Sequence, residues 1–420
     1  MKMSGFKESK YNYITERGDQ VYIYNTLHRS FLSLQKNLWE GFLDGNAETF
    51  TESEFSLLQS NGIILPKSVD ERYIFKDIMQ SSCLQSNEIS LFLSMTSLCN
   101  LSCPYCYQDC RIENKEKRFI DSEKIDILCR YLQKSKANKV NVVYFGGEPT
   151  LDTEQLIYAI HRINSLEGKS VNNTLITNGY SISDSLIAEI KTHESFLVQI
   201  TLDGDRRLHD STRVTHAKAG TYDIIIKNVD SLVNAITGKV CIRINVASYD
   251  FKPYERAIDS LAERYGDRIQ VGLAAVFSGQ KRKNETELKD IVDILDLIEY
   301  AQSKGYDTMP SIEYAPCVAT MRNSFAVDEN LNVYICPARL YEKSVGMITD
   351  DARFAIHDDE WYNAIYERKA CVEMCIYGGL CYGGCVMSKL ECRKDLFERL
   401  LPYVVENKII KYQKAKGSQK

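Results

Sequence analysis

The sequence lacks long apolar runs and lacks an excess of charge of either sign. No apolar stretch approaches the ~18 residues that a membrane-spanning helix needs, and the polar start MKMSGFKESKYNY has no apolar segment of the kind found in signal peptides. The 52 basic and 57 acidic residues give a formal net charge of -5, which provides no electrostatic reason to expect nucleic acid or an anionic membrane as a partner. We therefore expect a cytoplasmic protein that binds neither.

Cysteine, by contrast, is abundant, with 14 residues, and most of it is clustered. In a reducing compartment such residues are more typical of metal ligands or catalytic groups than of disulfides. Cys129 and Cys241 lie inside apolar runs, which favours simple packing of the thiol. Thiolates held close together repel one another unless a cation neutralises them, so the clusters indicate structural zinc or iron-sulfur clusters. The clustered residues are Cys99, Cys103, Cys106 and Cys110, then Cys371, Cys375, Cys381, Cys385 and Cys392, with Cys317 and Cys336 ahead of the second group.

The first 80 residues have the pattern of a small winged-helix-like domain. Residues 11–34 alternate polar and apolar side chains between turn signals, which predicts a three-stranded meander. Two helices should follow, the second beginning at Thr51, where Glu54 completes a capping box. We expect this domain over residues 1–80, followed by a helical connector.

The rest of the chain predicts an α/β protein with a cysteine-rich end. Over residues 89–305 strand and helix patterns alternate six times, which predicts parallel strands in a partial (β/α)6 TIM-like barrel with functional groups on the carboxyl-end loops. Residues 310–400 show little regular pattern and hold seven cysteines, as in a loop-rich domain organised by metal. Residues 401–420 are expected to form a solvated basic tail.

The first cysteine cluster follows directly on the first strand of the expected barrel. Three thiolates from Cys99, Cys103 and Cys106 would leave one iron of a 4Fe-4S cluster open for a small molecule to chelate. The segment CNLSCPYCY resembles the cluster motif of the radical S-adenosylmethionine (SAM) superfamily, with Tyr105 in the aromatic position before the third cysteine. Zinc on these cysteines and Cys110 is the alternative, which the further features below disfavour.

Those features lie at the ends of the next three strands. The second strand ends in a GGEP turn, the third in TNG and the fourth in LDG, and HD-x-x-R follows, as in the same superfamily. There these turns line the SAM pocket, and the resemblance implies that the GGEP backbone and carboxylate bind the methionyl ammonium. Taken singly, each is an ordinary turn. The implied SAM-binding residues are Tyr105, Gly146, Gly147, Glu148, Pro149, Thr177, Asn178, Asp203 and Arg213, the last as a contact to the SAM carboxylate.

The second cysteine group resembles the SPASM domain, which carries two auxiliary 4Fe-4S clusters in many radical SAM enzymes that modify peptides and proteins. This chain has three residues between Cys371 and Cys375 where two are usual, and Leu331 where glycine is usual; Asn330 could supply the positive-φ turn instead. Structural zinc is the alternative. The family pattern assigns Cys371, Cys375, Cys381 and Cys392 to a distal cluster, and Cys317, Cys336 and Cys385 to a nearer cluster with one open iron.

The resemblance therefore implies three 4Fe-4S clusters and SAM. A reduced cluster would cleave SAM to methionine and a 5′-deoxyadenosyl radical, which abstracts hydrogen from the substrate. The function we favour is that of an oxidoreductase that installs an intramolecular cross-link in a ribosomally synthesised precursor peptide. The cross-link that we expect is a Cys thioether. The N-terminal domain resembles the element that captures a leader peptide as an added strand; a mere packing cap is the other interpretation. An electron donor such as flavodoxin or ferredoxin is expected.

Three other functions stay open at this point. A carbon-carbon cross-linking cyclase shares every motif above. An anaerobic sulfatase maturase is disfavoured because Pro337 stands where that family places an Asp base. A non-catalytic iron-sulfur protein is disfavoured by the intact GGEP and TNG turns.

Overall fold

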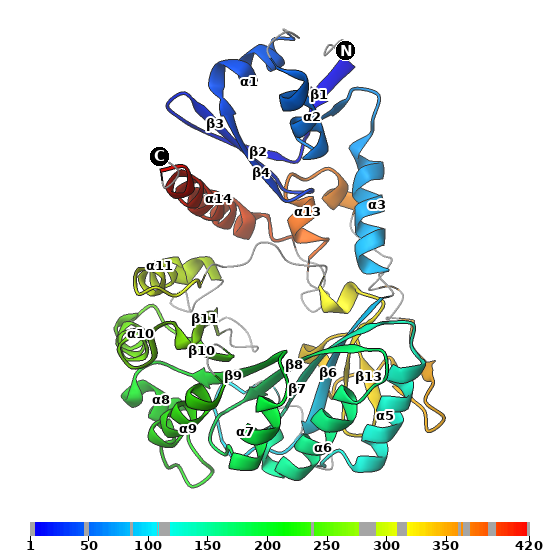
Figure 1. Ribbon diagram of the computed structural model, residues 1–420, viewed down its shortest axis with the longest axis vertical. Coiled ribbons are helices and arrows are strands. Elements are labelled where there is room, and N and C mark those ends of the chain that lie inside the picture. Colours follow the sequence, from blue (N-terminus) through cyan, green and yellow to red (C-terminus); the bar gives the residue numbers. More distant parts are fainter. Residues whose placement is uncertain are drawn as a thin grey trace. The chain divides into compact units, whose positions relative to one another are not determined.

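The computed structural model describes the chain in two compact units (Figure 1). The described residues are 5–45, 50–84, 87–106, 108, 118–236, 239–276, 291–308, 317–359, 363, 370–384 and 392–417. The first unit comprises Met1–Leu84, Ser311–Met321 and Ala364–Lys420, and the second comprises Gln85–Pro310 and Arg322–Asn363. The segment 310–400 that we expected to be one domain is thus divided between the two units.

The second unit is built on a sheet whose order is β11-β10-β9-β8-β7-β6-β12-β13-β14-β15. The six strands that the alternating pattern predicted pair with one another in parallel. Because β12 occupies the free side of β6, the described strands form an open sheet. The parallel strands are β6 (Glu88–Thr96), β7 (Lys139–Gly146), β8 (Ser170–Thr177), β9 (Phe196–Leu202), β10 (Val240–Val246) and β11 (Gln270–Ala275).

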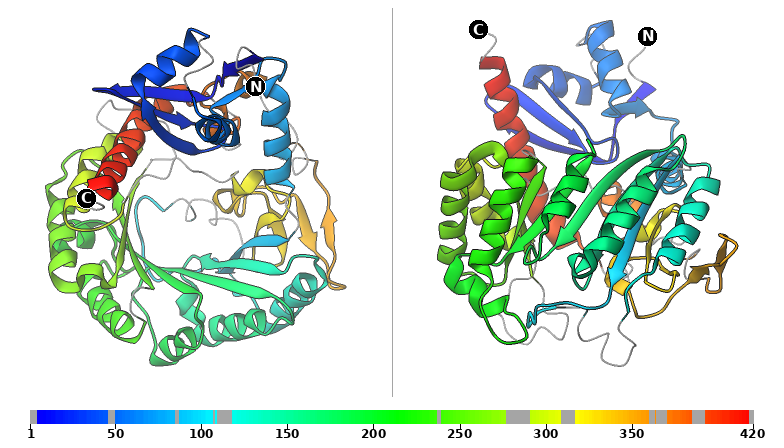
Figure 2. Two further views of the ribbon diagram at one scale, coloured as in Figure 1. Left: turned by 45° about the horizontal axis from the view of Figure 1, so that its top comes forward. Right: turned by 60° about the horizontal axis from the view of Figure 1, so that its bottom comes forward.

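Helices follow the parallel strands and lie along the outer side of the curved sheet (Figure 2). In β7, Val140, Val142 and Tyr144 are buried, while Asn141 and Val143 between them are half-buried. Side chains alternate between the two faces of a strand, so one face forms the core with the helices and the other lines the concave side. The helices are α5 (Ser122–Lys134), α6 (Thr153–Asn164), α7 (Asp184–Lys191), α8 (Arg206–Thr212), α9 (Tyr222–Ala235), α10 (Lys252–Tyr265) and α11 (Leu295–Ser303).

Four short strands that the sequence pattern did not reveal extend this sheet beyond β6. They are β12 (Ser324–Val327), β13 (Asn332–Tyr334), β14 (Gly346–Ile348) and β15 (Phe354–Ile356). β12 pairs in parallel with β6, and the next three pair antiparallel. In the turn between β12 and β13, Leu331 itself adopts φ 62°. The positive-φ position that we assigned to Asn330 therefore lies one residue later, where glycine is usual in the SPASM pattern.

The first unit contains the expected meander and its two helices. β2 (Asn12–Arg17), β3 (Gln20–Asn25) and β4 (Ser30–Gln35) form an antiparallel sheet in that order. Thr51 and Glu54 form the capping box as predicted. Val21, Ile23 and Trp39 are central to a core between this sheet and the helices. The remaining elements are β1 (Phe6–Glu8), α1 (Lys36–Leu43), α2 (Glu52–Ser60), β5 (Ile64–Pro66), the connector α3 (Glu71–Cys83) and α13 (Gly378–Cys381).

The C-terminal residues form a helix rather than the solvated basic tail that we expected for residues 401–420. α14 (Lys394–Gly417) buries Leu401, Val405 and Ile409, each at most 1% exposed. Their spacing of four residues places them on one side of the helix, which is why a segment rich in lysine still packs. The edge of the Tyr412 ring meets Tyr22, at 6.3 Å between centroids, on the sheet face opposite α1 and α2.

Short 3-10 helices complete the described chain: η2 (Pro149–Asp152), η3 (Gly266–Arg268), η4 (Ile291–Ile294), η5 (Val318–Thr320), η6 (Pro337–Arg339) and η7 (Ala370–Glu373). Within the described ranges, no helix has both the length and the apolar character needed to cross a membrane.

Candidate active site and metal centres

The GGEP turn packs directly against the loop that leads to Cys99. β6 and β7 are parallel neighbours, so their carboxyl ends meet at one edge of the sheet. The Gly147 N–H donates to the Thr96 carbonyl (2.8 Å), and the Glu148 N–H donates to the Leu98 carbonyl (2.7 Å). A Cβ atom on Gly146 would lie within 3.0 Å of the Thr96 carbonyl oxygen, and one on Gly147 within 3.0 Å of the Leu98 carbonyl oxygen. The glycines therefore permit a close backbone approach to the chain's own cysteine loop.

The Glu148 carboxylate joins the turn after β7 to the turn after β8. Its side chain is fully buried and accepts hydrogen bonds from the Thr150 N–H (3.0 Å) and hydroxyl (2.7 Å). It also accepts from the Thr177 hydroxyl (2.6 Å) and the Asn178 N–H (2.7 Å). Burial raises its pKa, and these donors oppose the shift. Pro149 begins η2 beside it. Glu148, expected to bind the methionyl ammonium, thus holds the GGEP and TNG turns together.

The TNG turn in turn contacts the cysteine loop. The Asn178 amide nitrogen donates to the Asn100 side-chain oxygen at 2.7 Å and lies 3.9 Å from the Cys99 sulfur. The pKa of Cys99 is raised to about 11, mainly by burial; Glu148 and the other two cysteines of the motif act in the same direction, and the Leu101 N–H opposes the shift. Thiolates held this close together repel one another unless a cation neutralises them, which fits an iron-sulfur cluster on Cys99, Cys103 and Cys106.

A buried polar cluster lies at the ends of β9 and α8. The Tyr105 hydroxyl donates to Asp203 Oδ2 at 2.6 Å and accepts from the Arg213 guanidinium at 2.9 Å. Arg213 Nη1 forms an ion pair with Asp203 Oδ1 at 4.0 Å, but among the described residues neither Asp203 Oδ1 nor Arg213 Nε has a hydrogen-bond partner. An unpaired buried donor and acceptor are costly unless a ligand satisfies them. This arrangement fits the polar groups of SAM, and it brings together three residues that the sequence motifs singled out separately.

His209 is the first residue of the HD-x-x-R motif, and the sequence analysis gave it no role of its own. It is fully buried, and its Nδ1 accepts from the Asp203 N–H at 3.4 Å. The Thr221 hydroxyl donates to the Arg213 carbonyl at 2.7 Å, so the 3.0 Å contact between His209 Nε2 and Thr221 requires the proton on Nε2. Burial lowers the pKa of His209 to about 3. The neutral ring thus positions both Asp203 and Arg213.

A second buried carboxyl, which no motif indicated, lies at the carboxyl end of β12. Glu329 Oε1 accepts from the Tyr341 hydroxyl at 2.5 Å and from the Ser94 hydroxyl at 3.1 Å. Burial raises the pKa of Glu329 to about 7. Ser94 lies on β6, five residues before Cys99. The sequence gives no signal for this group because it depends on the parallel pairing of β12 with β6.

The four cysteines that the family pattern assigns to the distal cluster line one cavity in the first unit, together with Tyr377 and Phe397. Burial raises the pKa of Cys381, and the other three cysteines raise it further. Among the described residues no three acidic, His or Cys side chains converge closely enough for a single metal ion; a cubane cluster takes one thiolate per iron and does not need that convergence. The four residues are Cys371, Cys375, Cys381 and Cys392.

The nearer cluster's cysteines are only partly described. Cys317 lies just before η5 in the first unit and Cys336 just before η6 in the second. Cys385, like Cys110, falls outside the described residues. Cys129 is buried at 3% exposure, as expected for packing, whereas Cys241 is only half-buried on the concave face of β10.

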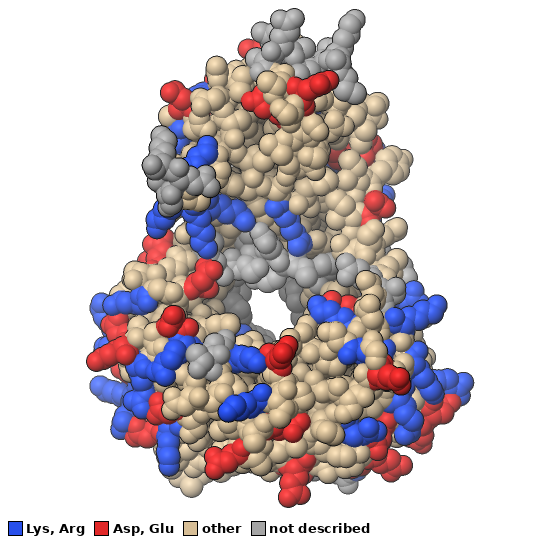
Figure 3. Space-filling view, in the orientation of Figure 1, with Lys and Arg blue, Asp and Glu red and all other residues tan. Residues whose placement is uncertain are grey.

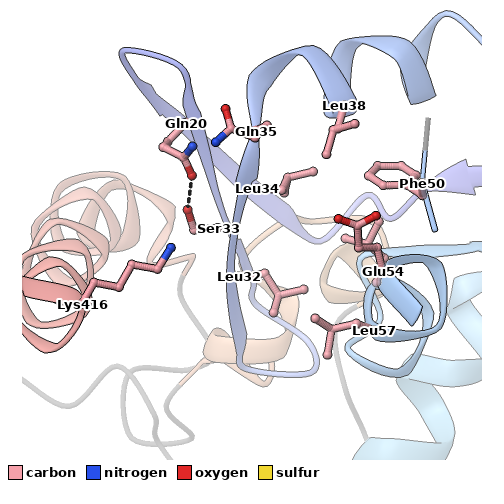
Figure 4. A pocket seen from close by; sticks show the side chains of 11 residues that line it. Gln20, Leu32, Ser33, Leu34, Gln35, Leu38, Phe50, Glu54, Leu57 and Lys416 are labelled. Carbon is pink, nitrogen blue, oxygen red and sulfur yellow. Dashed lines mark hydrogen bonds between the residues drawn. The ribbon is translucent and has the colours of Figure 1, made fainter. Parts of the chain in front are cut away.

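A groove of about 260 Å³ runs along β4 in the first unit (Figure 4). Because the described sheet has the order β2-β3-β4, β4 is an edge strand. Leucines from β4, α1 and α2 line one part of the groove, and Lys416 from α14 lines another. The lining residues are Gln20, Leu32, Ser33, Leu34, Gln35, Leu38, Phe50, Glu54, Leu57, Leu58 and Lys416.

Residues 93–247, which run from β6 to the end of β10, match the model of the radical SAM superfamily. A cysteine-type anaerobic sulfatase-maturating enzyme of Clostridium novyi is 26% identical over 173 residues, which cover 40% of this chain and 44% of that protein. A GTP 3′,8-cyclase of Psychromonas ingrahamii is 35% identical over 95 residues, covering 22% of this chain and 26% of that protein. The chain thus spans less than half the length of these relatives.

Two solved structures have a similar fold. The anSMEcpe structure with bound AdoMet and the Kp18Cys peptide is 17% identical, with a TM-score of 0.61 over 76% of this chain and 99% of that chain. The Streptococcus suis SuiB structure bound to precursor peptide SuiA is 15% identical, with a TM-score of 0.54 over 92% of this chain and 97% of that chain. Residues 93–247 therefore match a radical SAM domain, and the fold shared with these two structures confirms the expected α/β partial barrel.

Proposed function

We propose that this protein is a radical SAM peptide maturase that installs an intramolecular Cys thioether in a ribosomally synthesised precursor. The observation that carries the proposal is the convergence of three βα turns on the cysteine loop, with Asp203 Oδ1 and Arg213 Nε buried beside it and without hydrogen-bond partners among the described residues. Cysteines 99, 103 and 106 would hold the SAM-binding cluster. Once reduced, that cluster supplies the electron that cleaves SAM to methionine and a hydrogen-abstracting 5′-deoxyadenosyl radical.

The protein's own residues position and enclose the reactants in this proposal. Arg213 is suited to the SAM carboxylate and Asp203 to a SAM hydroxyl or ammonium, because each presents a buried polar atom without a hydrogen-bond partner among the described residues. Glu148 holds the two turns that form the pocket wall. The buried strand ends exclude water, which protects a carbon radical from side reactions.

The N-terminal unit supports a peptide as the substrate. Its sheet ends at the edge strand β4, beside an apolar groove, and such an edge can accept a leader peptide as an added strand. We propose residues 1–80 as the leader-recognition domain, 89–305 as the radical SAM barrel and 310–400 as the source of two auxiliary 4Fe-4S clusters. A flavodoxin or ferredoxin would supply the electrons.

Thioether formation replaces one C–H and one S–H bond by a C–S bond. The hydrogen atom goes to 5′-deoxyadenosine, the thiol proton to solvent, and the remaining electron to an iron-sulfur acceptor. The precursor therefore loses two hydrogens, and its thiol no longer reacts with alkylating agents. A product two hydrogens lighter whose cysteine still alkylates would instead indicate the carbon-carbon cyclase.

Pro337 distinguishes this proposal from sulfatase maturation. It opens η6 directly after Cys336, and a proline cannot serve as the carboxylate base expected at that position of a sulfatase maturase. This observation favours the peptide cross-link, although a sulfatase-maturating enzyme is among the curated relatives.

The decisive experiment is an anaerobic assay with SAM and a reductant. The reconstituted protein should bind about twelve irons, four for each of three cubane clusters, and should release 5′-deoxyadenosine. Replacing Cys99, Cys103 and Cys106 together with Ala should remove about four irons and abolish cleavage. Absence of 5′-deoxyadenosine from the wild-type reaction would reject an enzymatic function, and about four irons with zinc would reject the auxiliary clusters.

A further inference from the structure

The two faces of β4 lead to different surroundings. Leu32 and Leu34 pair with Ile23 and Val21, whose side chains belong to the core under α1 and α2. Phe31, Ser33 and Gln35 pair with Tyr24, Tyr22 and Gln20, on the opposite face of the sheet. Because side chains alternate along a strand, a peptide added to β4 would also point alternate residues toward these two faces.

The wall on the helix side of the groove is apolar. Leu32, Leu34 and Leu38 line it together with Phe50 and the 51%-exposed Leu57. Glu54 also lies there, where the Thr51 N–H and hydroxyl hold its carboxylate at 2.8 Å each and lower its pKa. This fixed negative charge disfavours acidic residues on the helix side of an added strand.

The wall on the other side comes from α14. The Tyr412 ring lies 6.1 Å from Phe31, and Gln413 donates to the Tyr22 hydroxyl at 3.1 Å, which positions the end of the helix beside β4. Lys416 lies over the Tyr412 ring at 4.7 Å and lines the groove. In Figure 4 its amino group points toward Ser33 and Gln20.

The end of α14 is also rich in positive charge. Lys408, Lys411, Lys414 and Lys416 all lie within its last ten residues, and Glu406 before them pairs with Arg17 of β2. Figure 3 shows basic side chains gathered over this part of the first unit. The groove is therefore apolar with a fixed carboxylate on one side and cationic on the other.

We propose that α14 forms the second wall of the leader site and selects an extended peptide segment in which apolar residues alternate with acidic ones. The apolar residues would pack on Leu34 and Leu57, and an acidic residue would pair with Lys416. This inference rests on the proposed function in one respect, namely that β4 captures the precursor by strand addition. The C-terminal helix then contributes directly to the choice of precursor.

The test measures binding of fluorescein-labelled peptides to the full chain by fluorescence anisotropy at low salt. The probes are peptides of about eight residues, within the usual length of a strand, that alternate Leu with Glu or Leu with Lys. The Leu/Glu peptide should bind more tightly by about threefold, the contribution of one exposed ion pair, and Lys416→Glu should invert the preference. Leu57→Gln should weaken both peptides about fivefold through lost apolar contact.

Lys411→Glu is the matched control, because it changes the net charge equally on the same helix but outside the groove lining. It should leave the preference unchanged. If both peptides bind equally, Leu57→Gln weakens that binding and Lys416→Glu does not change it, the proposed role of α14 would be overturned, whereas strand addition to β4 would stand. If Lys411→Glu also inverts the preference for the Leu/Glu peptide, that preference would come from the general positive charge of α14 and not from Lys416, and the proposal would be overturned.

Two further outcomes would reject the groove as a leader site. One is failure of the full chain to bind either peptide. The other is a dimer, seen by light scattering, that Leu57→Gln dissociates, which would assign the β4 edge to a second copy of this chain. The SAM-cleavage assay is independent of both results, so the radical SAM function would stand or fall separately.

Discussion

The two cysteine sites are held by different kinds of structure. The loop of Cys99 is fixed by backbone hydrogen bonds at the ends of parallel strands, where Thr96 and Leu98 bond the GGEP turn. The distal site is instead held by side chains of the N-terminal domain, since the Thr26 hydroxyl donates to the Ile376 carbonyl and the Tyr11 hydroxyl to the Glu373 carbonyl. The first site is preorganised by the fold, whereas hydrogen bonds join the second cysteine loop to the N-terminal domain.

The sharpest way to break the first site is to add one methyl group at Gly147. Its Cβ would clash with the Leu98 carbonyl, which belongs to the backbone and cannot move without shifting the cysteine loop. Gly147→Ala should cost about 2–4 kcal/mol of stability and reduce 5′-deoxyadenosine formation by about a hundredfold through misplacement of the reacting groups. Thermal unfolding and the cleavage assay measure both effects.

Gly272→Ala is the matched control for this change. It adds the same methyl group to β11 of the same sheet, where the nearest atom is the Cys241 sulfur at 3.9 Å. The control should leave SAM cleavage near the wild-type rate. A fully active Gly147→Ala protein would show that the close approach of the two loops does not matter for the chemistry.

A change at the distal site should instead affect the proposed leader-recognition domain. Cys381→Ala should lose about four irons, and because bound metal stabilises the loops that hold it, unfolding of the first unit should begin about 5–10 °C lower. Leader binding should weaken while SAM cleavage persists. Cys83→Ala, a buried cysteine of the same unit, should lose no iron. Unchanged leader affinity in Cys381→Ala would break the coupling between cluster and leader domain.

Glu329 offers a pH test near the first site. Because its pKa is raised to about 7, the native state holds its proton more tightly than the unfolded chain does. Its contribution to stability is therefore full below about pH 4.5 and is lost as pH rises through about 7, up to about 3 kcal/mol in total. Glu329→Gln should remove this slope. Parallel stability curves for both proteins between pH 5 and 8, measured by urea unfolding, would contradict the assignment.

The smallest expected effect comes from removing one side-chain hydrogen bond that holds the distal cysteine loop. Thr26→Val keeps the shape of the side chain and removes its hydrogen bond to the Ile376 carbonyl, at a cost of about 1 kcal/mol. Thr15→Val on β2 is the control, because no hydrogen bond of the Thr15 side chain occurs among the described residues. Iron retention at the distal site should fall in the first variant alone, as measured by chelator challenge.

Much of the fold and of the first site could be predicted because its signals are local. The spacing of apolar residues indicates strands and helices in alternation, and therefore the α/β architecture. Because the carboxyl ends of adjacent parallel strands meet at one edge of the sheet, the sequence alone predicts that Cys99, Glu148 and Asn178 lie close together. The features that the sequence did not predict depend on pairing between strands that are far apart in the chain. β12 joins β6 across more than 200 residues, and Glu329 and Ser94 share a hydrogen bond only because of that register.

The sequence by itself therefore determined the radical SAM motif, the cysteine groups and the capping box of Thr51, because each depends on residue types at short spacing. Only the tertiary structure decided that α14 packs on the N-terminal sheet, that His209 is a neutral positioning residue, and that Glu148 ties two turns together. The physical reason is that burial and hydrogen-bond partners arise from residues far apart in the chain. A lysine-rich segment, a histidine or a glutamate has no fixed role until the fold supplies its surroundings.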